Sequence, residues 1–166
     1  MPAGFPDRPR FAKMKAGQSC HDPMETHACI FCDIVAGRAP ASLVYRDDCV
    51  CAFLDIRPIN PGHLLVIPLR HSAGLADLDP ATGGRLFEVG QRLAAALRTS
   101  GVRCEGIDFF LADGEAAGQE VFHVHLHVVP RYAGDGFGLR YAPGFGAIAE
   151  RAKLEPLAAA LRAAIG

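Results

Sequence analysis

The sequence predicts an α+β fold in which an antiparallel sheet of about five strands packs against one long helix, with shorter helices near the chain ends. Two observations predict this class. Short aliphatic runs follow one another along the chain, and one long amphipathic segment separates the third run from the fourth. Strands grouped in this way are typical of an antiparallel sheet. Half of the 166 residues are hydrophobic, which is sufficient for one buried core.

The strands are expected where short apolar runs are bounded by turn residues. Asp47 and Asp48 mark one turn, and the proline- and glycine-containing stretch 58–62 marks another. Pro130 is expected to stop the last strand, because proline cannot donate a hydrogen bond to a neighbouring strand. The five predicted strands are residues 43–45, 50–55, 63–68, 107–111 and 121–129.

The long helix has clear local signals at both of its ends. Asp79 suits the N-cap and Pro80 suits the first helical position, while Gly101 is expected to end the helix. Between them, apolar residues recur every three to four positions, as they do on the buried face of a helix. Residues 80–99 are therefore predicted to form the long helix, and residues 29–37 and 156–165 the shorter ones.

The domain is expected to span residues 29–166. Residues 1–28 are proline-rich and show no sustained hydrophobic period, so they are expected to form a disordered N-terminal tail. The stretch 131–146 is rich in glycine and is expected to be a loop.

Composition and charge exclude several classes of function. Lys and Arg number 17 against 18 Asp and Glu, which gives a formal charge of −1, whereas a general nucleic-acid binder shows a basic excess. No apolar run approaches the roughly 18–20 residues of a membrane helix, and the first residues lack the apolar core of a secretory signal. A cytoplasmic protein without a nucleic-acid or membrane partner is expected, with its cysteines reduced or bound to metal.

Three histidines alternate along the last predicted strand. Side chains alternate between the two faces of a strand, so His123, His125 and His127 are expected on one face and the valines and leucine between them in the core. Three adjacent imidazolium ions would repel one another, so most of these rings should be neutral at pH 7. A neutral imidazole is both a nucleophile and a metal ligand. A solvated strand face and a three-histidine catalytic zinc site are the alternatives.

The segments around these histidines resemble the histidine-triad superfamily of nucleotide hydrolases and transferases, in particular its zinc-containing bacterial members. The loop and strand at 113–135 carry the resemblance, together with Phe53-Leu54-Asp55-Ile56 and with Pro61-Gly62-His63 and the apolar strand that follows. The resemblance covers about residues 29–136. It implies the fold of that family and a homodimer, because relatives join through a continuous sheet.

The resemblance implies roles for four histidines. In this family the middle histidine of the triad attacks the α-phosphate of a nucleotide and forms a covalent nucleotidyl-histidine, which water then hydrolyses. This role falls on His125. His127 and His63 correspond to the supporting histidines around the phosphate, and His123 belongs to the same set. A purely structural role for His63, at the start of an apolar strand, is the alternative.

The resemblance also implies how the nucleoside is held. Family members bury the base against apolar side chains, which here are Ile30, Phe31, Ile34 and Phe53. They bind the ribose hydroxyls with an acid, which here is Asp55. The aromatic residues can instead be core residues, and Asp55 can instead be a cap or a turn residue.

The phosphate loop departs from the family pattern at two positions. Backbone N–H groups of residues 118–121, which include Gln119 and Glu120, are expected to cradle phosphate oxygens. Many relatives have Asn or Gln where this chain has Ala112, and Ser or Thr where it has Glu120. A carboxylate at Glu120 would repel a polyphosphate unless it is protonated or turned away. Both departures put the preferred leaving group in doubt.

A structural zinc site is the expected cofactor site. Cys29 and Cys32 form a C-x-x-C pair with a spacing that suits zinc. In relatives that carry this pair, two histidines complete a tetrahedral centre, and these correspond to His71 and His123. A redox dithiol and a pair of buried thiols are the alternatives for the cysteines.

The expected function is hydrolysis at the α-phosphate of a purine nucleotide derivative. Nucleoside phosphoramidates, adenylates and dinucleoside polyphosphates are the candidate substrates. A nucleotidyl transferase, a nucleotide-binding or sensing protein with a degenerate site, and a zinc metallohydrolase are the alternatives.

Overall fold

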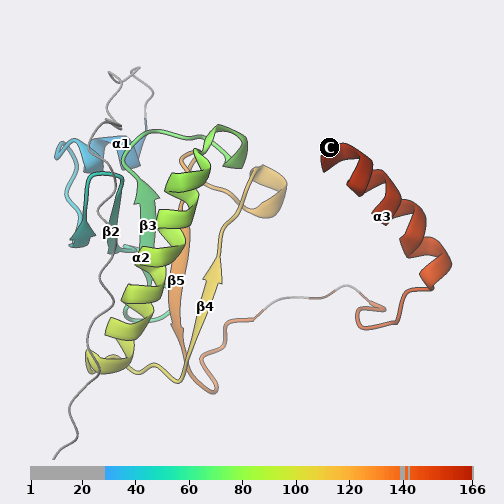
Figure 1. Ribbon diagram of the computed structural model, residues 1–166. Coiled ribbons are helices and arrows are strands. Elements are labelled where there is room, and N and C mark those ends of the chain that lie inside the picture. The colour runs from blue at the N-terminus through green and yellow to red at the C-terminus, as the bar shows by residue number, and fades with distance from the viewer. Residues whose placement is uncertain (1–28, 139–140, 142, 166) are drawn as a thin grey trace, which may run out of the picture. The chain divides into compact units, whose positions relative to one another are not determined.

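The computed structural model describes residues 29–138, 141 and 143–165 (Figure 1). The predicted N-terminal tail, residues 1–28, lies outside the described residues. The chain divides into two compact units, with the boundary between Asp135 and Gly136. The first unit contains the sheet and the histidines.

The first unit is built on a five-stranded antiparallel sheet with the strand order β1-β2-β3-β5-β4. This confirms the predicted α+β fold class. Strand β5, which contains His127, lies between β3 and β4 and is therefore an interior strand of the sheet. The strands are β1 (Leu43–Arg46), β2 (Val50–Leu54), β3 (Leu64–Pro68), β4 (Gly106–Phe110) and β5 (Leu126–Arg131).

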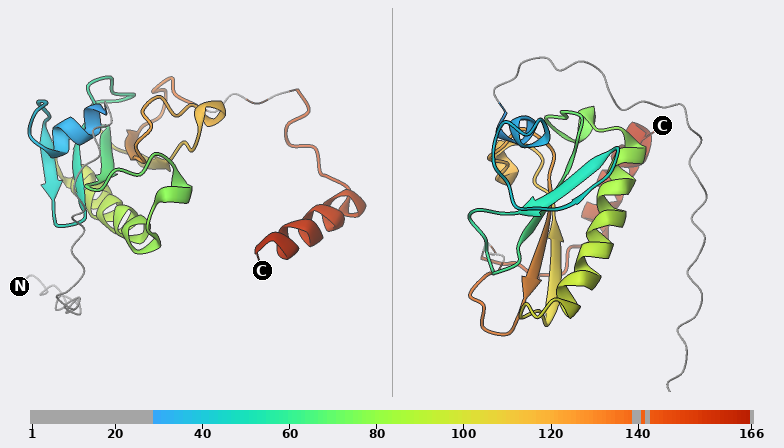
Figure 2. Two further views of the ribbon diagram at one scale, coloured as in Figure 1. Left: turned by 90° about the horizontal axis from the view of Figure 1, so that it is seen from above. Right: turned by 90° about the vertical axis from the view of Figure 1, so that its left-hand side faces the viewer.

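Two helices cover opposite faces of this sheet (Figure 2). Helix α2 (Pro80–Thr99) packs on the face to which Val50, Ala52 and Val66 point, and α1 (Ile30–Val35) packs on the face to which Cys51, Phe53 and Ile67 point. The alternation along β2 and β3 assigns each residue to one of the two cores. The histidine face is the one that α1 covers.

Helix α2 matches its prediction at both ends. The Asp79 carboxylate accepts a hydrogen bond from the backbone N–H of Thr82 at 2.9 Å, and Pro80 occupies the first turn. Gly101, just after the helix, has φ +84°, a conformation that glycine adopts without strain. These signals act over a few residues, so the bounds of the helix can be predicted from the sequence.

Replacement of glycine by alanine is expected to have opposite effects on stability at Gly84 and at Gly90 of α2, because their surroundings differ. A Cβ atom at Gly90 would lie 3.1 Å from side-chain atoms of both Leu126 and Phe109, whereas a Cβ at Gly84 would meet no atom within 4 Å. Gly84→Ala is expected to raise the free energy of unfolding by up to about 1 kcal/mol, since alanine is the better helix former. Gly90→Ala is expected to lower it by about 1–2 kcal/mol, because the methyl group overpacks the helix–sheet contact. Urea unfolding measures both, and stabilisation by Gly90→Ala would contradict the close packing.

Strand β5 differs from its prediction at both ends. It begins at Leu126 rather than at residue 121, and it continues through Pro130 to Arg131. Pro130 pairs only with β4, because the pairing with β3 ends at Val128. On its other side, the Pro130 carbonyl accepts a hydrogen bond from the side chain of Asn60, so the missing N–H of the proline faces no strand.

The second unit contains α3 (Arg151–Ile165), which begins five residues before the predicted helix. Pro156 lies inside the helix, where it removes one backbone donor. The first turn still forms, because the N–H groups of Lys153 and Leu154 donate to the carbonyl of Glu150. Neither α3 nor any other helix in the described part of the chain has the length and apolar character that crossing a bilayer requires.

Candidate active site

The three histidines lie on one face, as predicted, but only His127 is within a strand. Val124, Leu126 and Val128 point into the opposite core, which confirms the alternation. The expectation that His123 and His125 also lie in the strand is wrong. Strand β3 ends at Pro68, and the Pro68 carbonyl accepts a hydrogen bond from Nε2 of His123 at 2.9 Å. The His123 side chain therefore bonds to the Pro68 carbonyl, beyond the last pair of residues that joins β3 to β5.

Hydrogen bonding leaves one nitrogen of His125 as an acceptor. Its Nδ1 lies 2.7 Å from the carbonyl oxygen of His123. A carbonyl can only accept, so Nδ1 carries the proton and Nε2 of the neutral ring presents a lone pair. The acceptor lies two residues earlier in the same segment. The His125 side chain is buried and its ring contacts Phe31 edge-on.

A chain of hydrogen bonds assigns the protons of His63 and His127. The backbone N–H of Ile59 donates to Nδ1 of His63 at 3.2 Å, so His63 carries its proton on Nε2. That Nε2–H lies 2.9 Å from Nδ1 of His127 and donates to it. His127 in its neutral form then carries its own proton on Nε2. The His127 ring centroid is 4.8 Å from that of His125, so the two rings are direct neighbours.

Burial keeps these rings uncharged. Burial and the charges of His125 and His63 lower the pKa of His127 to about 3. The pKa of His63 is also lowered, mainly by burial, although the carboxylate of Asp55 opposes the shift. Burial, opposed by the hydrogen bond to Pro68, lowers the pKa of His123 to about 4. These three histidines are neutral at pH 7, in agreement with the expectation from charge repulsion.

Asp55 lies beside the histidines but keeps one oxygen available. Its Oδ1 accepts a hydrogen bond from the backbone N–H of Arg57 at 2.8 Å. Its Oδ2 lies 3.5 Å from Nδ1 of His63, but that nitrogen is already an acceptor and does not donate to it. Oδ2 therefore retains the capacity to accept a hydroxyl proton from a ligand.

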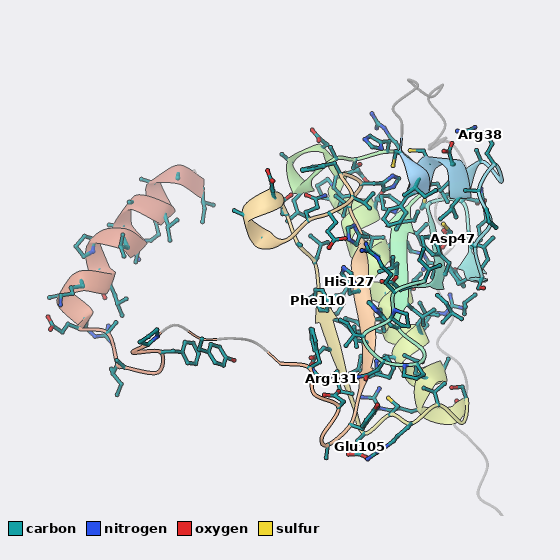
Figure 3. The ribbon with its side chains drawn as sticks, turned by 180° about the vertical axis from the view of Figure 1, so that it is seen from behind. Arg38, Asp47, Glu105, Phe110, His127 and Arg131 are labelled. Carbon is teal, nitrogen blue, oxygen red and sulfur yellow. The ribbon has the colours of Figure 1, made fainter. Side chains whose placement is uncertain are left out.

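Two further residues, Phe110 and Asn60, support the histidines and were not singled out in the sequence. Phe110, which pairs with His127 across β4 and β5, stacks on the His127 ring with centroids 4.2 Å apart (Figure 3). Asn60 is buried, and its side chain donates to the carbonyl of Pro130 and to Asp135, both at 2.9 Å. Its carbonyl accepts the N–H of His63. The Phe110–His127 stacking and the side-chain bonds of Asn60 join residues that are distant in sequence, so no local sequence pattern indicates them.

Three of the four residues predicted to hold the base are buried in the core between α1 and the sheet. Phe31, Ile34 and Phe53 are each less than a tenth exposed, and the Phe31 and Phe53 rings pack edge-on at 5.6 Å. Phe31 also contacts the rings of His123 and His125. Ile30, at the start of α1, is half exposed and offers accessible apolar surface. A base would contact this surface and the edges of the buried side chains.

The loop before the histidines is held by Gln119, whose amide is fully used as a donor. Its side chain accepts from the N–H of Gly114 at 2.7 Å and donates to the carbonyls of Ala73 and Val121. The Gln119 amide therefore holds the loop, and the predicted phosphate contacts of this segment depend on its backbone N–H groups. Gly118 has φ +88°, which explains the glycine at this turn.

Two of the four backbone N–H groups that were expected to bind phosphate already donate hydrogen bonds within the protein. The N–H groups of Gly118 and Gln119 donate to carbonyls within the loop. Within the described residues, the N–H groups of Glu120 and Val121 donate to no protein acceptor. These two groups are available to bind an anion.

Glu120, the departure from the family pattern, forms an ion pair that the sequence did not indicate. Its Oε2 lies 2.5 Å from a guanidinium nitrogen of Arg57, 63 positions earlier in the chain. The Glu120 carboxylate is turned toward a cation rather than left alone. The other departure, Ala112, lies just after β4 and offers no side-chain amide.

The four predicted metal ligands come together between α1 and the histidine segment. The ligand atoms of Cys29, Cys32, His71 and His123 all lie within 4.8 Å of one another. His123 Nδ1 is 3.6 Å from the sulfur atoms of both cysteines, and His71 Nδ1 is 3.3 Å from the Cys32 sulfur. His123 carries its proton on Nε2, so the nitrogen that faces the sulfurs is a lone pair.

These distances fit zinc. With Zn–S bonds of about 2.3 Å and Zn–N bonds of about 2.05 Å, a tetrahedral centre separates sulfur from nitrogen by about 3.6 Å. Two sulfurs and two nitrogens fill all four positions of such a centre. Burial, with the hydrogen bond and the charge of Cys29, raises the pKa of the Cys32 thiol to about 11. Metal binding must therefore displace a proton from this thiol.

Known proteins resemble this chain in sequence and in fold. An uncharacterized HIT-like protein from Borreliella burgdorferi is 46% identical over 113 residues, which cover 68% of this chain and 81% of that protein. The crystal structure of a Zn-bound histidine triad family protein from Mycobacterium smegmatis is similar at 48% identity and a TM-score of 0.65, over 70% of this chain and 84% of that one. A histidine triad nucleotide-binding protein from Candida albicans matches at 27% identity and a TM-score of 0.74, over 83% of this chain and 97% of that one.

The protein-family model of the HIT domain matches residues 36–134 of this chain. The matched region includes every histidine of the site and ends just before the boundary between the two units. The cysteines of the metal cluster precede the matched region. The fold, the histidine face and this match agree, and the chain belongs to the HIT domain family.

Proposed function

We propose that this protein hydrolyses purine nucleotide derivatives at the α-phosphate through a covalent intermediate on His125. One observation carries the proposal: Nδ1 of His125 donates to the His123 carbonyl, which leaves Nε2 as a lone pair, and the His127 ring lies next to that of His125 with centroids 4.8 Å apart. A buried neutral imidazole with a defined protonation is a suitable nucleophile for a phosphorus centre.

The reaction has two displacements. In the first, Nε2 of His125 attacks the α-phosphorus, a P–N bond forms, and the bond to the leaving group breaks. The leaving group departs with the electron pair and takes a proton from solvent. In the second, water attacks the same phosphorus and loses a proton to solvent. The P–N bond breaks, returning its electron pair to Nε2 and releasing the nucleoside monophosphate.

The surrounding groups suit the charge that develops on the phosphoryl oxygens. The Nε2–H of His127 is oriented by the hydrogen bond that its Nδ1 accepts from His63. The backbone N–H groups of Glu120 and Val121 supply two more donors. Preorganised donors of this kind stabilise a transition state without reorganising during the reaction.

The nucleoside has a matching set of contacts. Oδ2 of Asp55 is free to accept a ribose hydroxyl, and the exposed part of Ile30 with the edge of Phe31 offers an apolar surface for the base. The Candida albicans relative, described as nucleotide-binding, supports a nucleotide as the ligand.

We further propose that zinc at Cys29, Cys32, His71 and His123 is structural. The four side chains fill a tetrahedral shell, which leaves no position for a substrate or a water molecule. Bound zinc would supply a crosslink between α1 and the segment that carries His125. The expected homodimer and the cytoplasmic location stay predictions.

The proposed function predicts a trapped adduct. Incubation with adenosine and guanosine phosphoramidates and with dinucleoside polyphosphates should release the nucleoside monophosphate. A reaction quenched without acid should show, by mass spectrometry, a nucleotidyl group on the peptide that contains His125, because a phosphorus–nitrogen bond is labile in acid.

The outcomes separate the alternatives. Nucleotide binding without adduct or turnover across this panel would indicate a binding or sensing protein. The features of the sequence that favour this alternative are Ala112 and Glu120, which depart from the family pattern. An adduct that passes to an added acceptor faster than to water would indicate a transferase.

A further inference from the structure

We infer that Arg57 and Glu120 form a subsite that selects the leaving group by its charge and disfavours polyphosphate. The inference rests on the proposed function and names the kind of substrate that the same site prefers. A phosphoramidate whose leaving group is an uncharged amine is expected to react in preference to a dinucleoside polyphosphate.

Arg57 is linked to the reacting histidines through Asp55. The Arg57 backbone N–H donates to one oxygen of the Asp55 carboxylate, and the other oxygen lies 3.5 Å from the His63 ring. The His63 ring in turn donates to His127, whose ring is 4.8 Å from that of His125. Arg57 therefore belongs to the segment after β2 that borders the histidines, and its guanidinium group contacts Glu120.

Glu120 borders the same histidines from the other segment. It directly follows Gln119, whose amide holds the loop in place, and it precedes His123 by three residues. Its own N–H is one of the two free donors assigned above to the phosphate. Under the proposed function, Glu120 contacts the phosphate through its backbone, so its side chain extends from a residue that borders the leaving group.

The ion pair contributes little to the fold. The Arg57 and Glu120 side chains are 76% and 70% exposed, and exposed pairs typically contribute about 0–1 kcal/mol to stability. Within the described part of the chain, the two side chains have no other hydrogen-bond or ion-pair partner that a substitution would orphan. Changing either charge is therefore expected to leave the structure intact and to affect the ligands that approach.

The pair determines how much positive charge a leaving group meets. The neighbouring His63 and His127 are neutral, so Arg57 is the cation that a polyphosphate would need. Glu120 cancels that cation at 2.5 Å. An uncharged amine loses nothing by this arrangement, whereas a polyphosphate with several negative charges gains no net attraction. The arrangement therefore favours leaving groups of low charge.

Two charge variants with opposite expected effects test the inference. Glu120→Gln releases the Arg57 cation and should raise kcat/KM for a dinucleoside polyphosphate by about 3- to 10-fold, a range typical of single charges at a surface site. Arg57→Gln leaves Glu120 alone and should lower the same constant by a similar factor. For an adenosine phosphoramidate of an uncharged amine, the same substitutions should change kcat/KM less, so the ratio of the polyphosphate constant to the phosphoramidate constant should rise in Glu120→Gln and fall in Arg57→Gln. The changes should shrink at high salt.

A matched pair of charges elsewhere provides the control. Arg103 and Glu105 form an exposed ion pair at 2.9 Å, and Glu105 lies at the far end of the sheet from His127 (Figure 3). Arg103→Gln and Glu105→Gln should leave the ratio of the two kcat/KM values unchanged. Thermal melting of all four variants checks that each is folded.

The results separate this inference from the proposed function. A wild type that turns over neither substrate would refute the proposed function itself. A wild type that hydrolyses both, with the ratio of kcat/KM values unmoved by Glu120→Gln and Arg57→Gln, would overturn only the subsite. Equal losses on both substrates in both variants would also overturn it, because they would indicate a structural pair.

Discussion

Replacement of His125 by alanine is expected to lower kcat by at least about 10³-fold and to abolish the covalent adduct. The magnitude follows from other enzymes in which the nucleophile has been removed. Without Nε2 of His125, the neighbouring His127 cannot replace it, because Nδ1 of His127 already accepts from His63. Single-turnover kinetics with an adenosine phosphoramidate, followed by mass spectrometry, measure both effects.

Loss of folding is the competing explanation and requires a control. His125 is buried against Phe31, so the truncated side chain also leaves a void. The His125→Ala variant should still bind a nucleoside monophosphate within a few-fold of the wild type, and it should still hold one zinc ion per chain. A folded variant that keeps kcat within 10-fold of the wild type would refute the covalent mechanism.

Loss of the metal is expected to have the largest effect on stability. Cys32→Ala removes one of four ligands, so bound zinc should fall well below one ion per chain and the Tm should fall by about 10 °C or more, since the ion stabilises only the folded state. A chelator should lower the Tm of the wild type in the same way and leave that of Cys32→Ala almost unchanged. Elemental analysis and thermal melting measure these effects.

Cys104→Ala is the matched control. Cys104 is a partly buried free thiol outside the metal cluster, so its removal should change neither the zinc content nor the response to chelator. A chelator that abolishes turnover while the Tm stays constant would contradict a structural ion. That result would favour the metallohydrolase alternative instead.

The parts of the fold that could be predicted are those with local causes. Helix α2 begins at the predicted residue because its N-cap and first-turn proline lie next to each other in sequence. The common face of the three histidines follows from alternation along an extended segment. The metal ligands were available through the family resemblance, since their spacing in sequence does not itself bring His71 to the cysteines.

The parts that could not be predicted depend on partners distant in sequence. Strand β5 starts at Leu126 because the His123 ring occupies the Pro68 carbonyl, 55 positions away. The pairing of Glu120 with Arg57 and the engagement of the Gln119 amide have the same origin. A sequence indicates which groups are polar or charged, but the chain must fold before their partners are defined.

His123 serves the metal cluster with its ring and the nucleophile with its carbonyl. Displacement of this residue would leave His125 free to place its proton on either nitrogen, and a share of the molecules would then present the wrong atom to phosphorus. The measured kcat would fall because fewer molecules are competent, while each competent molecule would react at its former rate. Active-site titration of partly demetallated protein would register the defect as a smaller burst with an unchanged rate constant.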